Sequence, residues 1–177
     1  MWYAIRVTYG RELKFQQILQ DAGFETFIAM CRKRVVKNGR QVTVTLPAVS
    51  NLCFVNTEKE LLDAFMSSLG EACPARYIWD KATRKPTVVP QKAMDDFITV
   101  SRIMADDALY LKDITNKLRE GQKVRIIEGP FKGIEGKVVR IKRTRRIIVE
   151  IPGMLAIATT FIPPRDLEPI QDVNDTD

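Results

Sequence analysis

Residues 123–138 read KVRIIEGPFKGIEGKV, and this stretch sets the expected fold of the second half of the chain. Two runs rich in β-branched residues flank a short segment in which Gly129, Gly133 and Gly136 surround Phe131. Glycine tolerates the backbone angles of tight turns and lets two strands approach closely. The stretch therefore predicts a strand, a tight turn around Phe131 and a second strand.

The region around this stretch continues the same pattern. Strand-like runs occupy residues 124–127, 137–142, 147–151 and 155–161, with turn residues between them. Short strands separated by turns at intervals of about 8–12 residues are typical of a small barrel. We therefore expect residues 119–170 to form a small SH3-like β-barrel, followed by a flexible tail over 171–177.

The N-terminal half alternates strand and helix patterns. Residues 2–8 are rich in aromatic and β-branched side chains, and Phe15, Ile18, Leu19 and Ala22 then recur at helical spacing. An Asn38-Gly39 pair between alternating runs predicts a hairpin over residues 32–46. The pattern predicts an α+β domain over residues 1–104, with helices packed on a mainly antiparallel sheet, and a linker over 105–118.

The positive charge is concentrated in two places. The chain has 28 basic and 22 acidic side chains, and residues 119–146 alone hold ten basic and three acidic ones. Basic side chains bind phosphates by releasing condensed counterions, although a single basic turn is often merely solvated. Because two clusters fall on two expected hairpins, we expect contact with nucleic acid. The first cluster is Arg32, Lys33, Arg34, Lys37 and Arg40. The second is Lys137, Arg140, Lys142, Arg143, Arg145 and Arg146, of which the last four form a basic turn.

Several kinds of active site are excluded by composition. The chain contains no histidine, which excludes Ser-His-Asp and Cys-His catalysis and histidine-bound zinc. Its three cysteines are about twenty residues apart, so a metal knuckle or a disulfide framework is not expected. The carboxylate pairs Asp95-Asp96 and Asp106-Asp107 are adjacent, and adjacent helical residues do not face one another. We expect a protein that is not an enzyme and has no cofactor.

The stretch at residues 123–138 resembles the KOW motif of NusG-type transcription factors, in Gly129, Pro130, Phe131, Gly133 and Gly136. The N-terminal half is similar to the start of the NusG N-terminal domain, with Trp2-Tyr3-x-x-Arg6 followed by Gly10-x-Glu12. Residues 49–52 read VSNL where general elongation factors of this type have Phe-Pro-Gly-Tyr. In this respect the chain looks more like the specialised UpxY-type paralogues of Bacteroides, which are antiterminators of capsular polysaccharide operons.

The resemblance implies a cytoplasmic, monomeric factor that binds the clamp helices of RNA polymerase and promotes read-through. By position, the polymerase-binding groove would involve Val49, Leu52, Trp79 and Met94. The first basic cluster would face upstream or non-template DNA. The edge of the KOW barrel that meets ribosomal protein S10 or Rho would involve Met154, Leu155 and Ile157. Ordinary core packing is the alternative for Met94, for Trp79 and for part of the barrel edge.

Two other possibilities concern the second domain. KOW barrels also occur in ribosome-associated and RNA-binding proteins, although these rarely carry the Trp-Tyr-led domain. One branch of the NusG family folds its C-terminal domain into a helical hairpin. The β-branched residues of 137–151 and the three glycines of the KOW motif disfavour a helix here, so we expect a permanent β-structure. The chain shows no signal peptide pattern and no stretch long enough to span a membrane.

Overall fold

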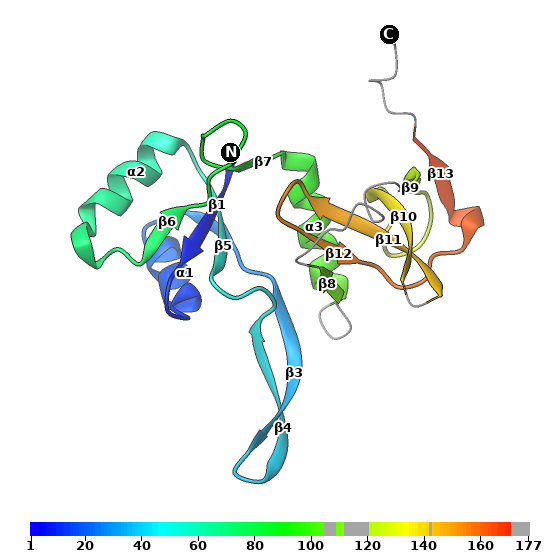
Figure 1. The fold of residues 1–177 in the computed structure, drawn as a ribbon, viewed down its shortest axis with the longest axis horizontal. Helices are drawn as coiled ribbons and strands as arrows, with labels where there is room; N and C mark the ends of the chain where they lie inside the picture. The colour runs from blue at the N-terminus through cyan, green and yellow to red at the C-terminus, as the bar shows by residue number, and fades with distance from the viewer. Residues whose placement is uncertain (105–108, 112–120, 142, 171–177) are drawn as a thin grey trace. The chain divides into compact units, whose positions relative to one another are not determined.

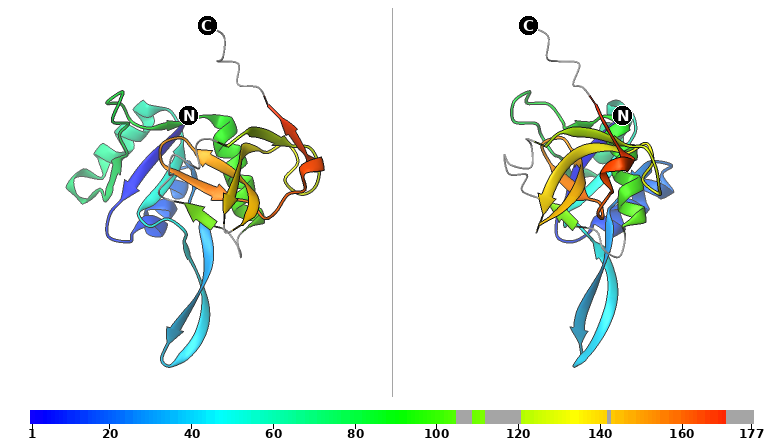
Figure 2. Two further views of the ribbon diagram at one scale, coloured as in Figure 1. Left: turned by 45° about the vertical axis from the view of Figure 1, so that its right-hand side comes forward. Right: turned by 90° about the vertical axis from the view of Figure 1, so that its right-hand side faces the viewer.

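The computed structural model describes residues 1–104, 109–111, 121–141 and 143–170 (Figures 1 and 2). The chain divides into two units, Met1–Met94 and Asp95–Asp177. The division falls inside helix α3 (Gln91–Ile103), upstream of the boundary expected after residue 104. Most of the expected linker and the expected tail lie outside the described residues.

The first unit is built on a five-stranded antiparallel sheet around β1 (Trp2–Val7). The strand order is β2-β5-β1-β6, and β7 also pairs with β1. The other strands are β2 (Glu25–Phe27), β5 (Leu52–Asn56), β6 (Ala75–Tyr77) and β7 (Val88–Val89). The antiparallel sheet predicted from the sequence is confirmed.

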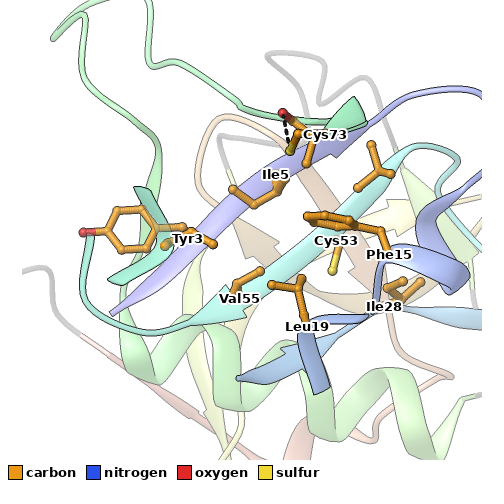
Figure 3. Packing of buried hydrophobic residues seen from close by; sticks show 11 residues of the cluster. Tyr3, Ile5, Phe15, Leu19, Ile28, Cys53, Val55 and Cys73 are labelled. Carbon is orange, nitrogen blue, oxygen red and sulfur yellow. Dashed lines mark hydrogen bonds between the residues drawn. The ribbon is translucent and has the colours of Figure 1, made fainter. Parts of the chain in front are cut away.

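Helices α1 (Glu12–Asp21) and α2 (Lys59–Ser68) contribute to the core on one face of this sheet, and a 3-10 turn (Gly70–Ala72) follows α2. Tyr3, Ile5 and Val7 alternate along β1 and point into one buried cluster, which also contains Phe15 and Leu19 of α1 (Figure 3). Each such side chain contributes about 1.5–3 kcal/mol when it leaves water. The cluster therefore fixes the α+β arrangement predicted from the alternating pattern.

A polar contact ties α2 to the sheet. The Tyr77 hydroxyl donates a hydrogen bond to Asp63 Oδ1 over 2.8 Å, and Lys59 forms an ion pair with Asp63 one helical turn away. Hydrogen bonds from Lys59 and Tyr77 hold the pKa of Asp63 below its ordinary value. Burial, followed by the hydrogen bond to Asp63, raises the pKa of Tyr77.

The predicted hairpin is confirmed and forms a separate two-stranded ribbon. Strands β3 (Met30–Lys37) and β4 (Arg40–Pro47) pair along their whole length and extend away from the five-stranded sheet (Figures 1 and 2). Asn38 and Gly39 at the tip have φ values of 51° and 74°. Positive φ at both central positions is the geometry that an Asn-Gly turn adopts readily.

The second unit contains a six-stranded antiparallel sheet with the order β13-β9-β10-β11-β12-β8. Among the described residues, no pairing joins the end strands β13 and β8, so the expected closed barrel is not established by strand pairing. The strands are β8 (Leu109–Leu111), β9 (Lys123–Ile126), β10 (Glu135–Ile141), β11 (Thr144–Ile151), β12 (Leu155–Ala158) and β13 (Leu167–Pro169). A 3-10 turn (Pro164–Asp166) precedes β13.

Strand β8 corrects the expected linker, because residues 109–111 pair with β12. The physical reason is apolar packing, since Leu111 lies against the buried cluster that contains Val139 and Ile148. Tyr110 on the same strand packs edge-on against Phe97 of α3, with ring centroids 6.2 Å apart. The Tyr110 hydroxyl also lies 2.7 Å from Ser101 Oγ. These contacts explain why the later part of α3 belongs to the second unit.

No helix among the described residues has the length and apolar character needed to cross a membrane.

Candidate functional site

The hairpin carries the first basic cluster as the sequence predicted. All five basic side chains are exposed, and none lies in the buried core of the first unit. They are Arg32, Lys33 and Arg34 in the middle of β3, with Lys37 and Arg40 at the tip.

Strand register divides these basic side chains between the two faces of the ribbon. Lys37 lies directly opposite Arg40, so these two share a face, and Lys33 points to that same face. Arg32 and Arg34 project from the other face, where each lies opposite a threonine of β4. Like charges directly opposite one another destabilise a strand pair. The Lys37–Arg40 pair therefore works against the hairpin's own stability, which favours a role in contacting an external anion.

The four residues expected in the polymerase-binding groove do not form one exposed surface. Trp79 is 58% exposed, whereas Leu52 and Met94 are 7% and 0% exposed. Leu52 pairs with Arg6 inside the sheet, and Met94 lies on the apolar stripe of α3. Val49 is half-buried in the segment between β4 and β5. The expectation of a groove formed by all four side chains is therefore wrong, because two of them serve the core.

A hollow at the base of the hairpin was not anticipated. A cavity of about 330 Å³ is lined by Glu12 and Leu13 of α1, by Lys33, Leu46 and Pro47 of the hairpin, and by Gly10 and Ser50. Leu13 and Leu46 are exposed there. Glu12 is buried, and its Oε1 accepts a hydrogen bond from the backbone N–H of Asn51 over 3.3 Å. Gly10-x-Glu12 was noted in the sequence as part of the family resemblance. Its position beside the base of the hairpin depends on the fold.

The glycine turn of the second unit has the predicted geometry. Gly129 and Gly133 have φ values of 81° and 86°, and the Gly133 N–H donates to the Ile126 carbonyl over 2.7 Å. Phe131 is 4% exposed, so its ring serves the core. A Cβ atom at Gly136 would lie 2.4 Å from the Ile148 carbonyl oxygen, which confirms the predicted close approach of strands.

The expected partner edge of the second unit is corrected. Leu155 and Ile157 are 2% and 0% exposed, and they lie on β12, a strand paired on both edges, with β11 and β8. Leu155 and Ile157 are therefore core residues, which was the alternative interpretation of this edge. Met154 is half-buried and remains the one residue of the three with accessible surface.

The second basic cluster is only partly available to a partner. Arg146 is half-buried and donates from Nη1 to the Thr159 carbonyl over 3.1 Å. Arg143 and Arg145 are exposed, and Arg145 lines a cavity of about 420 Å³ together with Gln122 and Ile147. Lys142 lies outside the described residues.

The described residues offer no metal site, since no group of three or more carboxylate or thiol side chains gathers among them. Cys53 and Cys73 are buried and Cys31 is half-buried, and all three are free thiols. Burial, together with the nearby Glu12 carboxylate, raises the pKa of Cys53 to about 12. At that pKa the Cys53 thiol is a poor nucleophile at neutral pH.

Residues 1–98 match the family model described as transcription termination factor NusG. The chain belongs to the NusG family. Residues 120–150 match the KOW motif, in the domain order of the family resemblance. A solved structure described as domain interaction in Thermotoga maritima NusG matches the chain at 15% sequence identity; the alignment covers 96% of this chain and 97% of that one with a TM-score of 0.42. No curated protein sequence matches the chain significantly.

Within this NusG-family chain, the hairpin presents five exposed basic side chains. The hairpin is formed by two strands of alternating residues, β3 and β4, joined by an Asn-Gly turn. The sequence indicated both strands and the turn. The surface at its base is a feature of the fold, because α1 and the two ends of the hairpin meet there.

Proposed function

We propose that this NusG-family chain is a non-enzymatic transcription elongation and antitermination factor, which acts in the cytoplasm by binding RNA polymerase through its N-terminal domain. The observation that supports this most strongly is the occurrence of both family modules on one chain, at residues 1–98 and 120–150. The basic hairpin adds a physical reason for action beside nucleic acid. The narrower UpxY-type role, read-through of capsular polysaccharide operons, belongs to the same proposal.

In this proposal the hairpin faces upstream or non-template DNA. Its cationic side chains lie on both faces of a ribbon that extends from the sheet, so it can contact phosphates without moving the domain core. Phosphate contacts position a protein on DNA but carry no sequence information. The hairpin would therefore strengthen binding to the transcription complex rather than select an operon.

The polymerase-binding surface is proposed around the base of the hairpin and Val49. Leu13 and Leu46 are exposed there beside a cavity, and neighbouring exposed apolar side chains mark interaction sites. Leu52 supports this surface from within the sheet instead of contacting the polymerase. Val49→Asp is consequently a cleaner test than Leu52→Asp, which would place a carboxylate in the core.

In the second unit we propose a small KOW barrel that meets a partner such as ribosomal protein S10 or Rho through Met154. Arg143 and Arg145 lie at the other end of β11, and we propose that they face nucleic acid. The accessible surface of these three side chains supports the assignment. The internal hydrogen bond of Arg146 argues that this arginine stabilises the sheet.

The test is co-purification with core RNA polymerase at moderate salt, followed by in vitro transcription of leader templates. We expect the wild-type chain and a Leu61→Asp control to bind polymerase and increase read-through, because Leu61 is exposed on α2, away from the proposed surface. Val49→Asp should bind polymerase at least tenfold more weakly, the equivalent of about 1.4 kcal/mol. Sedimentation with ribosomes in the absence of polymerase binding would overturn the proposal and favour a ribosome-associated KOW protein.

A further inference from the structure

The loop between β6 and β7 (Figure 1) contains an exposed aromatic residue, Trp79. Every residue from Trp79 to Lys85 is exposed, and the Trp79 side chain is 58% exposed. The other tryptophan, Trp2, is 2% exposed. Tryptophan is highly buried on average, so an exposed one is informative about binding.

The loop has a defined geometry that holds Trp79 in place. Trp79 forms a β-bridge with Pro86 at the base of the loop, and the Asp80 N–H donates to the Lys85 carbonyl over 2.9 Å. Asp80 Oδ1 accepts hydrogen bonds from the N–H groups of Ala82 and Thr83, over 2.7 and 3.0 Å. These contacts order the backbone that carries Trp79, so less loop entropy is lost when a ligand binds.

Three basic side chains share this loop with Trp79. Lys81, Arg84 and Lys85 are all exposed, and none of them forms an ion pair with another of the described residues. The one acidic residue of the loop, Asp80, directs a carboxylate oxygen to the loop's own backbone. The surface thus presents an aromatic face and three cations against one carboxylate within seven residues.

This combination fits a chain of phosphates with accessible bases. A base stacks on an aromatic side chain regardless of sequence, while nearby cations pair with the phosphates on either side. In a duplex the bases are stacked on one another, so their faces are not available to an aromatic side chain. We propose that residues 79–86 bind single-stranded nucleic acid, with a base stacked on Trp79 and phosphates paired with Lys81, Arg84 and Lys85.

The proposal does not depend on the polymerase-binding function. It assigns Trp79 to a nucleic acid instead of to the polymerase groove expected from family position. An exposed tryptophan beside arginine is also a common centre of protein–protein interfaces. The test must therefore separate these two kinds of partner.

Intrinsic fluorescence provides the test, because Trp79 is exposed and Trp2 is buried. The full-length chain is titrated with a fifteen-residue oligothymidylate and, in parallel, with a fifteen-base-pair duplex. We expect the single strand to quench the exposed component of the fluorescence and to bind more tightly than the duplex. The affinity should fall with salt, with a slope that decreases by about two when Lys81, Arg84 and Lys85 are all changed to Gln.

Variants distinguish stacking from general electrostatic attraction. Trp79→Leu keeps an apolar side chain but removes both the aromatic face and the reporting fluorophore, so its affinity is compared with that of the wild type by the fluorescence anisotropy of a dye-labelled oligothymidylate. We expect the affinity of this variant for the single strand to be about tenfold lower. Phe161→Ala, an exposed aromatic residue of the second unit, serves as control and should bind as the wild type does. Lys37→Glu/Arg40→Glu on the hairpin can weaken overall binding, but the fluorescence quenching at saturation should remain.

Two results would overturn the proposal. One is binding of the single strand by Trp79→Leu with wild-type affinity, with both proteins showing the same circular dichroism spectrum. The other is weaker co-purification of Trp79→Leu with core RNA polymerase while its affinity for the oligonucleotide is unchanged, which would assign Trp79 to a protein interface. If Trp79→Leu fails to fold, Trp79→Thr, which also lacks an aromatic ring, replaces it, and the triple Gln variant tests the phosphate contacts separately.

Discussion

Gly136 passes so close to Ile148 that a Cβ atom on Gly136 would lie 2.4 Å from the Ile148 carbonyl oxygen. The Ile147 Cγ2 atom would be 2.7 Å from the same position. Two strands of the second unit, β10 and β11, thus approach at a point where only glycine fits. The third glycine of the KOW motif is required for space, whereas Gly129 and Gly133 are required for backbone conformation.

The first prediction separates these two requirements within one motif. Gly136→Asn should destabilise the protein by about 1–3 kcal/mol, because a larger side chain forces strands apart. Gly133→Asn should cost less than about 1 kcal/mol, since asparagine tolerates positive φ and open space surrounds that position. Urea unfolding of the full-length variants, followed by circular dichroism, gives both values. Equal losses at the two glycines would contradict the assigned roles.

Features with a local cause were predictable from sequence. The Asn38-Gly39 turn and the alternation of β3 and β4 depend on neighbours in the chain, and the structure has both. The roles of the glycines in the KOW motif were likewise predictable, because tight turns and close strand contacts admit few other residues.

Exposure was harder to predict, because it depends on strands that are distant in sequence. Leu155 and Ile157 follow a Pro-Gly turn, which indicated exposure, yet both side chains are buried, on a strand that pairs with β11 and with β8. Residues 109–111 gave a weak pattern because a three-residue strand shows little periodicity. The same limit applies to Leu52, whose burial follows from its pairing with β1.

A second prediction concerns the opposed charges at the hairpin tip. Lys37→Glu places a carboxylate opposite Arg40, and replacing a like-charged pair by an opposite one should stabilise the ribbon by about 0.2–1 kcal/mol. The same change should reduce read-through in transcription assays, because the hairpin loses a phosphate-binding cation. A protein that is more stable but less active would show that the charge serves a partner. The control is Lys132→Glu/Arg165→Glu, two exposed cations of the second unit. If Lys37→Glu and Lys37→Glu/Arg40→Glu both leave read-through unchanged, the hairpin does not face DNA.

A third prediction follows from the Tyr77–Asp63 hydrogen bond. Because the native pKa of Asp63 is lowered, its contribution to stability is present above the unfolded-state pKa of about 3.9 and is lost as the pH falls through the lower native value. Tyr77→Phe should cost about 0.5–1 kcal/mol at pH 7, since Asp63 is partly exposed and solvent screens the contact. The variant should also show a smaller loss of stability between pH 5 and pH 2. The measurement is the urea midpoint over that range; an unchanged acid dependence would show that Tyr77 does not support the carboxylate.

The last prediction orders the three thiols by reactivity. Cys53 and Cys73 lie in the buried cluster beneath α1 and α2, whereas Cys31 sits half-buried at the base of the hairpin. Burial raises the pKa of Cys53 to about 12, so at pH 8 its thiolate is roughly a thousandfold scarcer than at the reference value of 9.0. The native protein should therefore release one equivalent of thionitrobenzoate quickly from Ellman's reagent at pH 8, and three after unfolding in guanidinium. Cys31→Ser should remove the fast phase without changing the free energy of unfolding by more than about 0.5 kcal/mol, because its side chain is outside the core. A fast phase that survives in Cys31→Ser would mean that the core opens readily around Cys53 or Cys73, and the packing of the sheet against the two helices would then be weaker than its burial implies.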